Sequence, residues 1–218
     1  MAGFFKRRVN PLFCFFAFFS VLFFSCIGAS SQIKLNSDGS GTIIQEYRIS
    51  LELENMGKLD GNENQPPLPA GKKDIERTIE RVPGLRLVSY SSYEDGKDRI
   101  YRVELAFDSL EALVSLFSAN NQQFKADLLQ KRMEIRFSAA EKADLTYREL
   151  MGNAFEGYGF SISFSVPGTA KTAWFDENGN KVQQFPGACS VKDKIVEYSA
   201  PMADIVFLYN SLTLEISW

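Results

Sequence analysis

The chain has 218 residues, with 24 lysine and arginine residues against 27 aspartate and glutamate residues, and it contains no histidine. A net charge of −3 argues against a nucleic-acid-binding protein, because nucleic acids require clustered positive charge. The lack of histidine excludes Ser-His-Asp and Cys-His nucleophile activation as well as histidine-ligated zinc.

The first 25 residues have the pattern of a secretory signal. Three basic residues at 6–8 precede the apolar run Pro11–Phe24, which has 14 residues, whereas a membrane-spanning helix needs roughly 20. Ser25 then places a small residue directly before Cys26, as in a lipobox. Phenylalanines stand at 23 and 24, where leucine and a small residue are commoner, and this looser form resembles the signals of spirochaetal lipoproteins.

We therefore predict a lipoprotein signal peptide at 1–25, acylation of Cys26 with palmitate-type chains, and a short tether at 26–31. Two or three acyl chains would hold the protein firmly in a membrane, so membrane lipid is an expected partner of Cys26. The alternative is an ordinary cleavage after Ala29 or Ser30, which would give a secreted protein.

Cleavage before Cys26 leaves 193 residues, with 21 basic and 27 acidic side chains and a net charge of −6. The cysteines that remain are Cys26 and Cys189, so an intramolecular disulfide framework is not expected. Cys189 is open to two readings, a reactive thiol or a small and partly buried apolar residue, and we favour the second.

Alternating apolar and polar residues predict strands through much of the remaining chain. The longest is 42–54, where Ile43, Tyr47 and Ile49 fall on one face and Glu46 and Arg48 on the other. Further strands are expected at 33–35, 85–93, 99–107, 124–128, 131–137, 158–166, 169–175, 181–185, 194–198 and 212–218. Apolar residues at helical spacing predict helices at 74–82, 110–119, 138–151 and 201–209.

Two of these helices begin with a capping-box pattern, in which Asp108 and Ser138 are the expected caps. Residues 55–71 are rich in Gly, Asn and Pro and predict an exposed loop. Hairpins with helices between them predict one α+β domain over 32–218. We expect a mostly antiparallel sheet with three to four helices packed on one face.

Few residues suggest chemistry. Glu141 with Asp144, and Glu149 with Glu156, are carboxylate pairs that could serve acid–base catalysis, although helix-dipole stabilisation explains the first pair without it. The segments 60–64 and 176–180 each mimic the start of a calcium loop, but neither has the later glycine and glutamate, so both are interpreted as turns. We predict no catalytic residue, no metal site and no cofactor.

The order of several short motifs resembles the LppM-like bacterial lipoprotein family. These motifs are the lipobox, Asp38–Gly41 before a long strand, Phe107–Leu110 opening a helix, Phe160–Gly168 (FSISFSVPG), and an Asn-Gly turn. The resemblance spans about residues 31 to 218. It implies an envelope lipoprotein with an α+β domain and association with a lipid or glycolipid, and it supplies no catalytic residue.

Many members of that family continue into a C-terminal membrane helix, whereas this sequence stops at Trp218, so the acyl group at Cys26 is the expected anchor. Three functions follow as hypotheses. The first is a non-enzymatic lipoprotein of the bacterial envelope that binds a lipid, glycolipid or other amphipathic ligand. The second is an envelope scaffold that docks another protein without a ligand cavity, and the third is a hydrolase that uses carboxylates alone.

Overall fold

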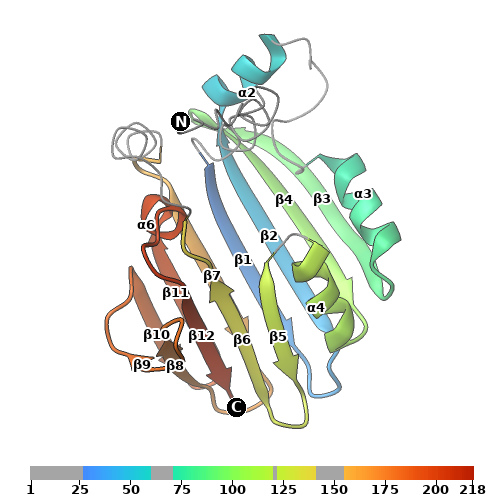
Figure 1. Cartoon of the computed structure of the whole chain (residues 1–218). Coiled ribbons are helices and arrows are strands. Elements are labelled where there is room, and N and C mark those ends of the chain that lie inside the picture. The colour runs from blue at the N-terminus through green and yellow to red at the C-terminus, as the bar shows by residue number, and fades with distance from the viewer. Residues whose placement is uncertain (1–26, 60–70, 120–121, 141–154) are drawn as a thin grey trace, which may run out of the picture.

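The computed structural model describes residues 27–59, 71–119, 122–140 and 155–218 (Figure 1). Within these ranges the protein is α+β, and its strands form two large, mostly antiparallel sheets. The seven-stranded sheet has the order β10 (Ala188–Lys192), β11 (Ile195–Pro201), β7 (Gly159–Ser165), β1 (Ile27–Leu35), β2 (Gly41–Ser50), β4 (Asp98–Phe107) and β3 (Leu85–Asp95). The five-stranded sheet has the order β5 (Gln123–Asp127), β6 (Arg132–Phe137), β12 (Leu212–Ser217), β8 (Lys171–Phe175) and β9 (Lys181–Val182).

The sequence predicted a single sheet, and the division into two is a correction. Alternation identifies the strands and their inward faces, but not which strand pairs with which. β1 pairs antiparallel with β2 and parallel with β7, so that Ser30 lies opposite Ser161. β12 joins the second sheet instead, between β6 and β8.

The main core lies between the two sheets. Successive residues of a strand point to opposite faces, and the inward-facing Ile33, Ile43 and Phe164 of the larger sheet are at most 2% exposed. Leu214 and Ile216 of β12 are fully buried in the same core. In Figure 1 the strands β5, β6 and β12 lie in front of the larger sheet, whose other face carries mostly small and polar side chains.

Four helices lie within the described residues: α2 (Leu51–Leu59), α3 (Lys72–Arg81), α4 (Leu110–Ala119) and α6 (Met202–Val206). α3 and α4 contribute side chains to the main core, among them Ile75 and Leu113. α2 contributes Leu53 to a smaller cluster with Ile27, and α6 contributes Met202 to a third cluster. Among the described residues, no helix has both the length and the apolarity needed to cross a bilayer.

The predicted strand 42–54 is wrong after residue 50. β2 ends at Ser50, and Leu51–Leu59 form α2 in place of the end of a strand and the start of a loop. The hydroxyl of Ser50 accepts a 3.2 Å hydrogen bond from the amide of Leu53, as a helix N-cap does, and acidic residues occupy the first turn. Alternating Leu and Glu residues are compatible with a strand as well as with a helix, and Ser50 is the local signal that favours the helix.

The predicted tether at 26–31 is wrong from its second residue. β1 is in hydrogen-bonded register from Ile27, which lies opposite Ile49. Small residues suggested a linker, but here they allow strands to pass closely. A Cβ on Gly28 would lie 3.3 Å from the carbonyl oxygen of Gly159 and 3.6 Å from Cβ of Arg48.

Smaller predictions also changed. Helix α4 is capped by Ser109, whose Oγ accepts a hydrogen bond from the amide of Ala112, where Asp108 was the predicted cap. β10 was not predicted, and α6 is shorter than the expected 201–209. The signal peptide at 1–25, Cys26, most of the predicted loop 55–71 and residues 141–151 of the predicted helix 138–151 lie outside the described residues, and residues 138–140 are not helical.

Candidate functional site

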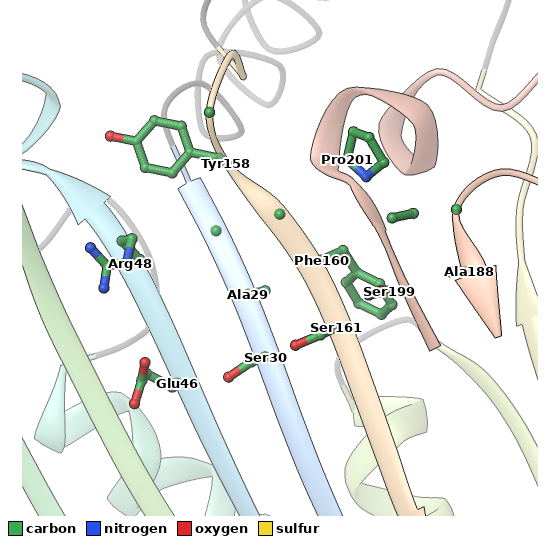
Figure 2. Close-up of a pocket in the computed structure, with 15 residues that line it drawn as sticks. Ala29, Ser30, Glu46, Arg48, Tyr158, Phe160, Ser161, Ala188, Ser199 and Pro201 are labelled. Carbon is green, nitrogen blue, oxygen red and sulfur yellow. The ribbon is translucent and has the colours of Figure 1, made fainter. Parts of the chain in front are cut away.

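A groove of about 750 Å³ lies on the larger sheet, where β1 and β7 begin and β11 ends (Figure 2). Ser30, Ser161 and Ser199 are cross-strand neighbours that line it. They alternate with the core residues of their strands, so the groove opens on the face turned away from the five-stranded sheet. Its floor is wide because serine and glycine leave space above the backbone.

The two sides of the groove differ in chemistry. Figure 2 shows Arg48 and Glu46 on β2 beside Tyr158 on one side, and Pro201 and Ala188 on the other. A row of hydroxyl groups with an aromatic ring and a guanidinium at one edge suits an amphipathic molecule with a polar head.

A charged network fixes the Arg48 edge of the groove. Nη1 of Arg48 donates to Oδ2 of Asp98 at 3.1 Å, and Nη2 donates to Oδ2 of Asp95 at 2.9 Å. The hydroxyl of Tyr158 donates to Oδ1 of Asp98 at 2.7 Å. The Asp98 side chain is only 4% exposed, whereas that of Arg48 is 41% exposed. Asp98 therefore joins β2, β4 and the segment before β7 through one buried carboxylate.

The electrostatics follow from these bonds. Hydrogen bonds to Asp98 and then Asp95 raise the pKa of Arg48 above its ordinary value. The ammonium of Lys97 lies 5.4 Å from the centre of the Tyr158 ring, within cation–π range. The arrangement thus gathers charged and polar groups around Asp98, whose two oxygens each accept one of these side-chain hydrogen bonds.

A second network lies beside the first. Arg99 donates from Nε to Glu54 of α2 and from Nη2 to Glu94 of β3, both at 2.8 Å. Burial, followed by the charge of Glu54, raises the pKa of Tyr101 to about 12. These contacts fasten α2 to the end of the sheet where the groove lies.

The residues singled out in the sequence do not meet at this groove. Cys26, Glu141, Asp144 and Glu149 lie outside the described residues, and Glu156 is exposed in the turn before β7. The turn prediction for residues 176–180 is confirmed, because Asp176 accepts hydrogen bonds from the backbone amides of residues 178 and 180. Within the described residues there is no group of three or more side chains suited to hold a metal ion.

Cys189 lies apart from the groove, on the core side of β10, and is half-buried. Burial raises the pKa of its thiol, and contacts with Trp174 and Thr172 act in the opposite direction. Trp174 is 4% exposed, and its Nε1 has no hydrogen-bond partner of normal geometry. This environment agrees with the interpretation of Cys189 as a partly buried apolar residue.

Comparison with known proteins gives distant likenesses among solved structures alone. No protein-family model and no curated protein matches the chain. Among solved structures, the NMR structure of the folded domain of Mycobacterium tuberculosis LppM aligns with 88% of this chain and 90% of its own, at 11% identity and a TM-score of 0.43.

Sequence reasoning missed the groove residues. Arg48 was placed correctly on the polar face of its strand, but its partner Asp98 is 50 residues away in the chain. Ser30 falls in the predicted tether at 26–31, and Ser161 falls in the predicted strand at 158–166. Nothing in the sequence indicates that these two segments lie side by side.

Proposed function

We propose that the protein is a bacterial envelope lipoprotein. Its signal peptide spans residues 1–25, and it is anchored to a membrane through acylated Cys26. Its domain binds an amphipathic lipid or glycolipid in the groove and does not transform it. The signal pattern before Cys26 supports the anchor, and the lack of histidine in the sequence supports a binding role over a catalytic one.

One observation carries the ligand-binding part of the proposal. The groove is lined by Gly28, Ala29 and Ser30, which follow Cys26 within four residues. A lipid-attached protein whose concave surface begins beside its own attachment point is well placed to hold a molecule from that membrane. The serine floor and the Arg48 edge match a polar head group, and the Tyr158 ring, with Ala188 and Pro201 on the other side, matches the apolar part of a ligand.

The anchor is tested by metabolic labelling with radioactive palmitate in a bacterium that processes this signal. The wild-type chain is expected to incorporate label and to fractionate with membranes, and Cys26→Ala to do neither. Unlabelled wild-type protein that begins downstream of Cys26 would instead support cleavage after Ala29 or Ser30.

The ligand is tested by native mass spectrometry of the protein from the same host. Ser161→Trp should fill the groove, while Ser163→Trp lies two residues along the same face, outside the lining. If the tryptophan keeps about two methylene groups of the lipid out of the groove, the affinity for the lipid falls roughly tenfold. We therefore expect retained lipid in the wild type and in Ser163→Trp, and a large loss in Ser161→Trp. Equal lipid content in all three would contradict the proposal.

A second candidate function is a scaffold that docks another envelope protein. Strand β3 favours it, because it is an edge strand of the larger sheet in the described structure and exposes Val88 and Tyr93. An exposed strand edge can pair with a further strand. Crosslinking in cells separates the two functions: a single dominant protein partner that attaches through β3, with no retained lipid, would favour the scaffold.

A further inference from the structure

Strand register determines which residues lie together at the end of the domain where β1 begins. Ile27 lies opposite Ile49 at the end of β2, and Ser50 lies opposite Asp98 at the start of β4. β7 runs parallel to β1 and begins at the same end, and Pro201 of β11 lies opposite Gly159. We call this surface the β1 end. It comprises Ile27, the β3–β4 turn (residues 94–97), residues 155–158 and residues 202–207.

Cys26 directly precedes Ile27, the first residue of β1, so no linker separates it from this end. β1 is in register from Ile27, and consecutive Cα atoms are about 3.8 Å apart. The head-group layer of one leaflet is about 5–8 Å thick, from the difference between total and hydrocarbon thickness. A sulfur atom that carries acyl chains therefore holds the β1 end within that layer.

Some side chains of the β1 end suit the head-group layer of a membrane, and others do not. Aromatic rings and lysine are common at membrane–water interfaces. The rings of Phe155 and Phe207 contact each other at a centroid distance of 6.1 Å, but Phe155 and Tyr158 are only 2% and 7% exposed. The partly exposed Phe207 and the exposed Lys97 are the groups of this kind that can face the bilayer surface. Acidic residues are also present, however, among them Glu94, Asp95, Glu156 and Asp204, so anionic lipids do not attract this surface. Its position depends on the covalent anchor.

The groove extends from the same end. Its lining begins at Gly28 and includes Gly157–Ser161, and a strand rises about 3.3 Å per residue. Its near part thus lies about 7–14 Å along β1 from Cys26. The near end of the groove therefore borders the head-group layer, so a lipid of the anchoring leaflet need rise only a short distance from that layer to enter it.

We infer that the β1 end lies in the head-group layer of the leaflet that holds the acyl chains of Cys26, and that the groove takes its lipid from that leaflet. This inference rests on the proposed function. It adds an orientation and a source for the ligand, and both depend on the direct passage from Cys26 into β1.

The test uses the full acylated protein in phosphatidylcholine vesicles that contain a head-group quencher. Two variants, each in a Cys189→Ser background, carry a fluorescent label at Glu156→Cys or at Leu129→Cys. Leu129 is 96% exposed at the opposite end, where its neighbour Leu128 lies 3.4 Å from a Cβ built on Gly39. β2 has 10 residues between the two ends, or about 34 Å.

Each labelled variant is also made with 12 Gly/Ser residues inserted between Cys26 and Ile27, a linker with an average span of about 17–21 Å. We expect strong quenching at residue 156, little at 129, and loss of the difference with the linker. A lipid with a photoreactive head group should attach to residues 157–161, and less so after insertion. Equal quenching at both labels without the linker, or an unchanged pattern with it, would overturn the inference. Failure of palmitate incorporation would instead refute the proposed function.

Discussion

Replacing Asp98 with alanine tests whether the buried carboxylate organises the groove edge. The change removes the acceptor of both Arg48 Nη1 and the Tyr158 hydroxyl. Breaking a fully buried ion pair costs about 3–5 kcal/mol. Arg48 is 41% exposed and keeps its bond to Asp95, so we expect a smaller loss, about 2–4 kcal/mol, in the free energy of unfolding.

The assay is urea and thermal unfolding of a chain that begins at residue 26 and carries Cys26→Ser. For a domain of this size the expected loss corresponds to a decrease in Tm of about 5–15 °C. Asp95→Ala is the matched control, because it removes the exposed partner of the same arginine, and such pairs are worth about 0–1 kcal/mol. If Asp98→Ala costs no more than Asp95→Ala, the carboxylate does not hold the three segments together.

The other predictions concern a thiol, a turn and a glycine. Cys189 should react slowly with iodoacetamide at pH 7–8, because burial raises its pKa, and unfolding in urea should speed the reaction; equal rates in both states would refute this. Hydrogen bonds with Asn180 lower the pKa of Asp176. The turn is therefore stabilised at pH values above the ordinary carboxyl pKa, and it loses that stability as the pH falls through the lowered pKa. NMR titration of the Asp176 carboxyl should show the low pKa, and Asn180→Ala should raise that pKa. A Cβ on Gly41 would lie 2.0 Å from a backbone oxygen, so Gly41→Ala should destabilise the domain by about 3 kcal/mol or more. Gly168→Ala, with 3.4 Å contacts, should be nearly neutral by the same unfolding assay.

Local pattern predicted the strands and helices that depend on local chemistry. The hairpin of β3 and β4, the helix α4 and the final strand β12 occur close to their expected ranges. In each, apolar periodicity and a nearby turn or capping residue point to the same structure. The Asn-Gly turn between β8 and β9 is a further case, because its aspartate and glycine favour one geometry.

The errors have a physical origin in non-local contacts. Leu51–Glu54 alternates like a strand, yet the chain turns there because the Leu51 amide bonds to the carbonyl of Lys97, and Glu54 meets Arg99. Ser50 is a local capping signal, but the other partners that hold this conformation lie more than 40 residues away. A pattern read along a few residues contains no information on such contacts.

The groove itself arises from missing side-chain volume. On the outer face, β1 presents Gly28 and Ser30, and β7 presents Gly159 and Ser161, with larger groups at Arg48 and Tyr158 beside them. β1 and β7 are the parallel pair of the described sheets, joined across more than 100 residues, and this pairing aligns the two small stretches. Each stretch alone resembles a linker or a wet strand face. Side by side, the two stretches form the groove, which begins two residues after Cys26. The small residues that made β1 resemble a linker in the sequence also create the space that a ligand would occupy.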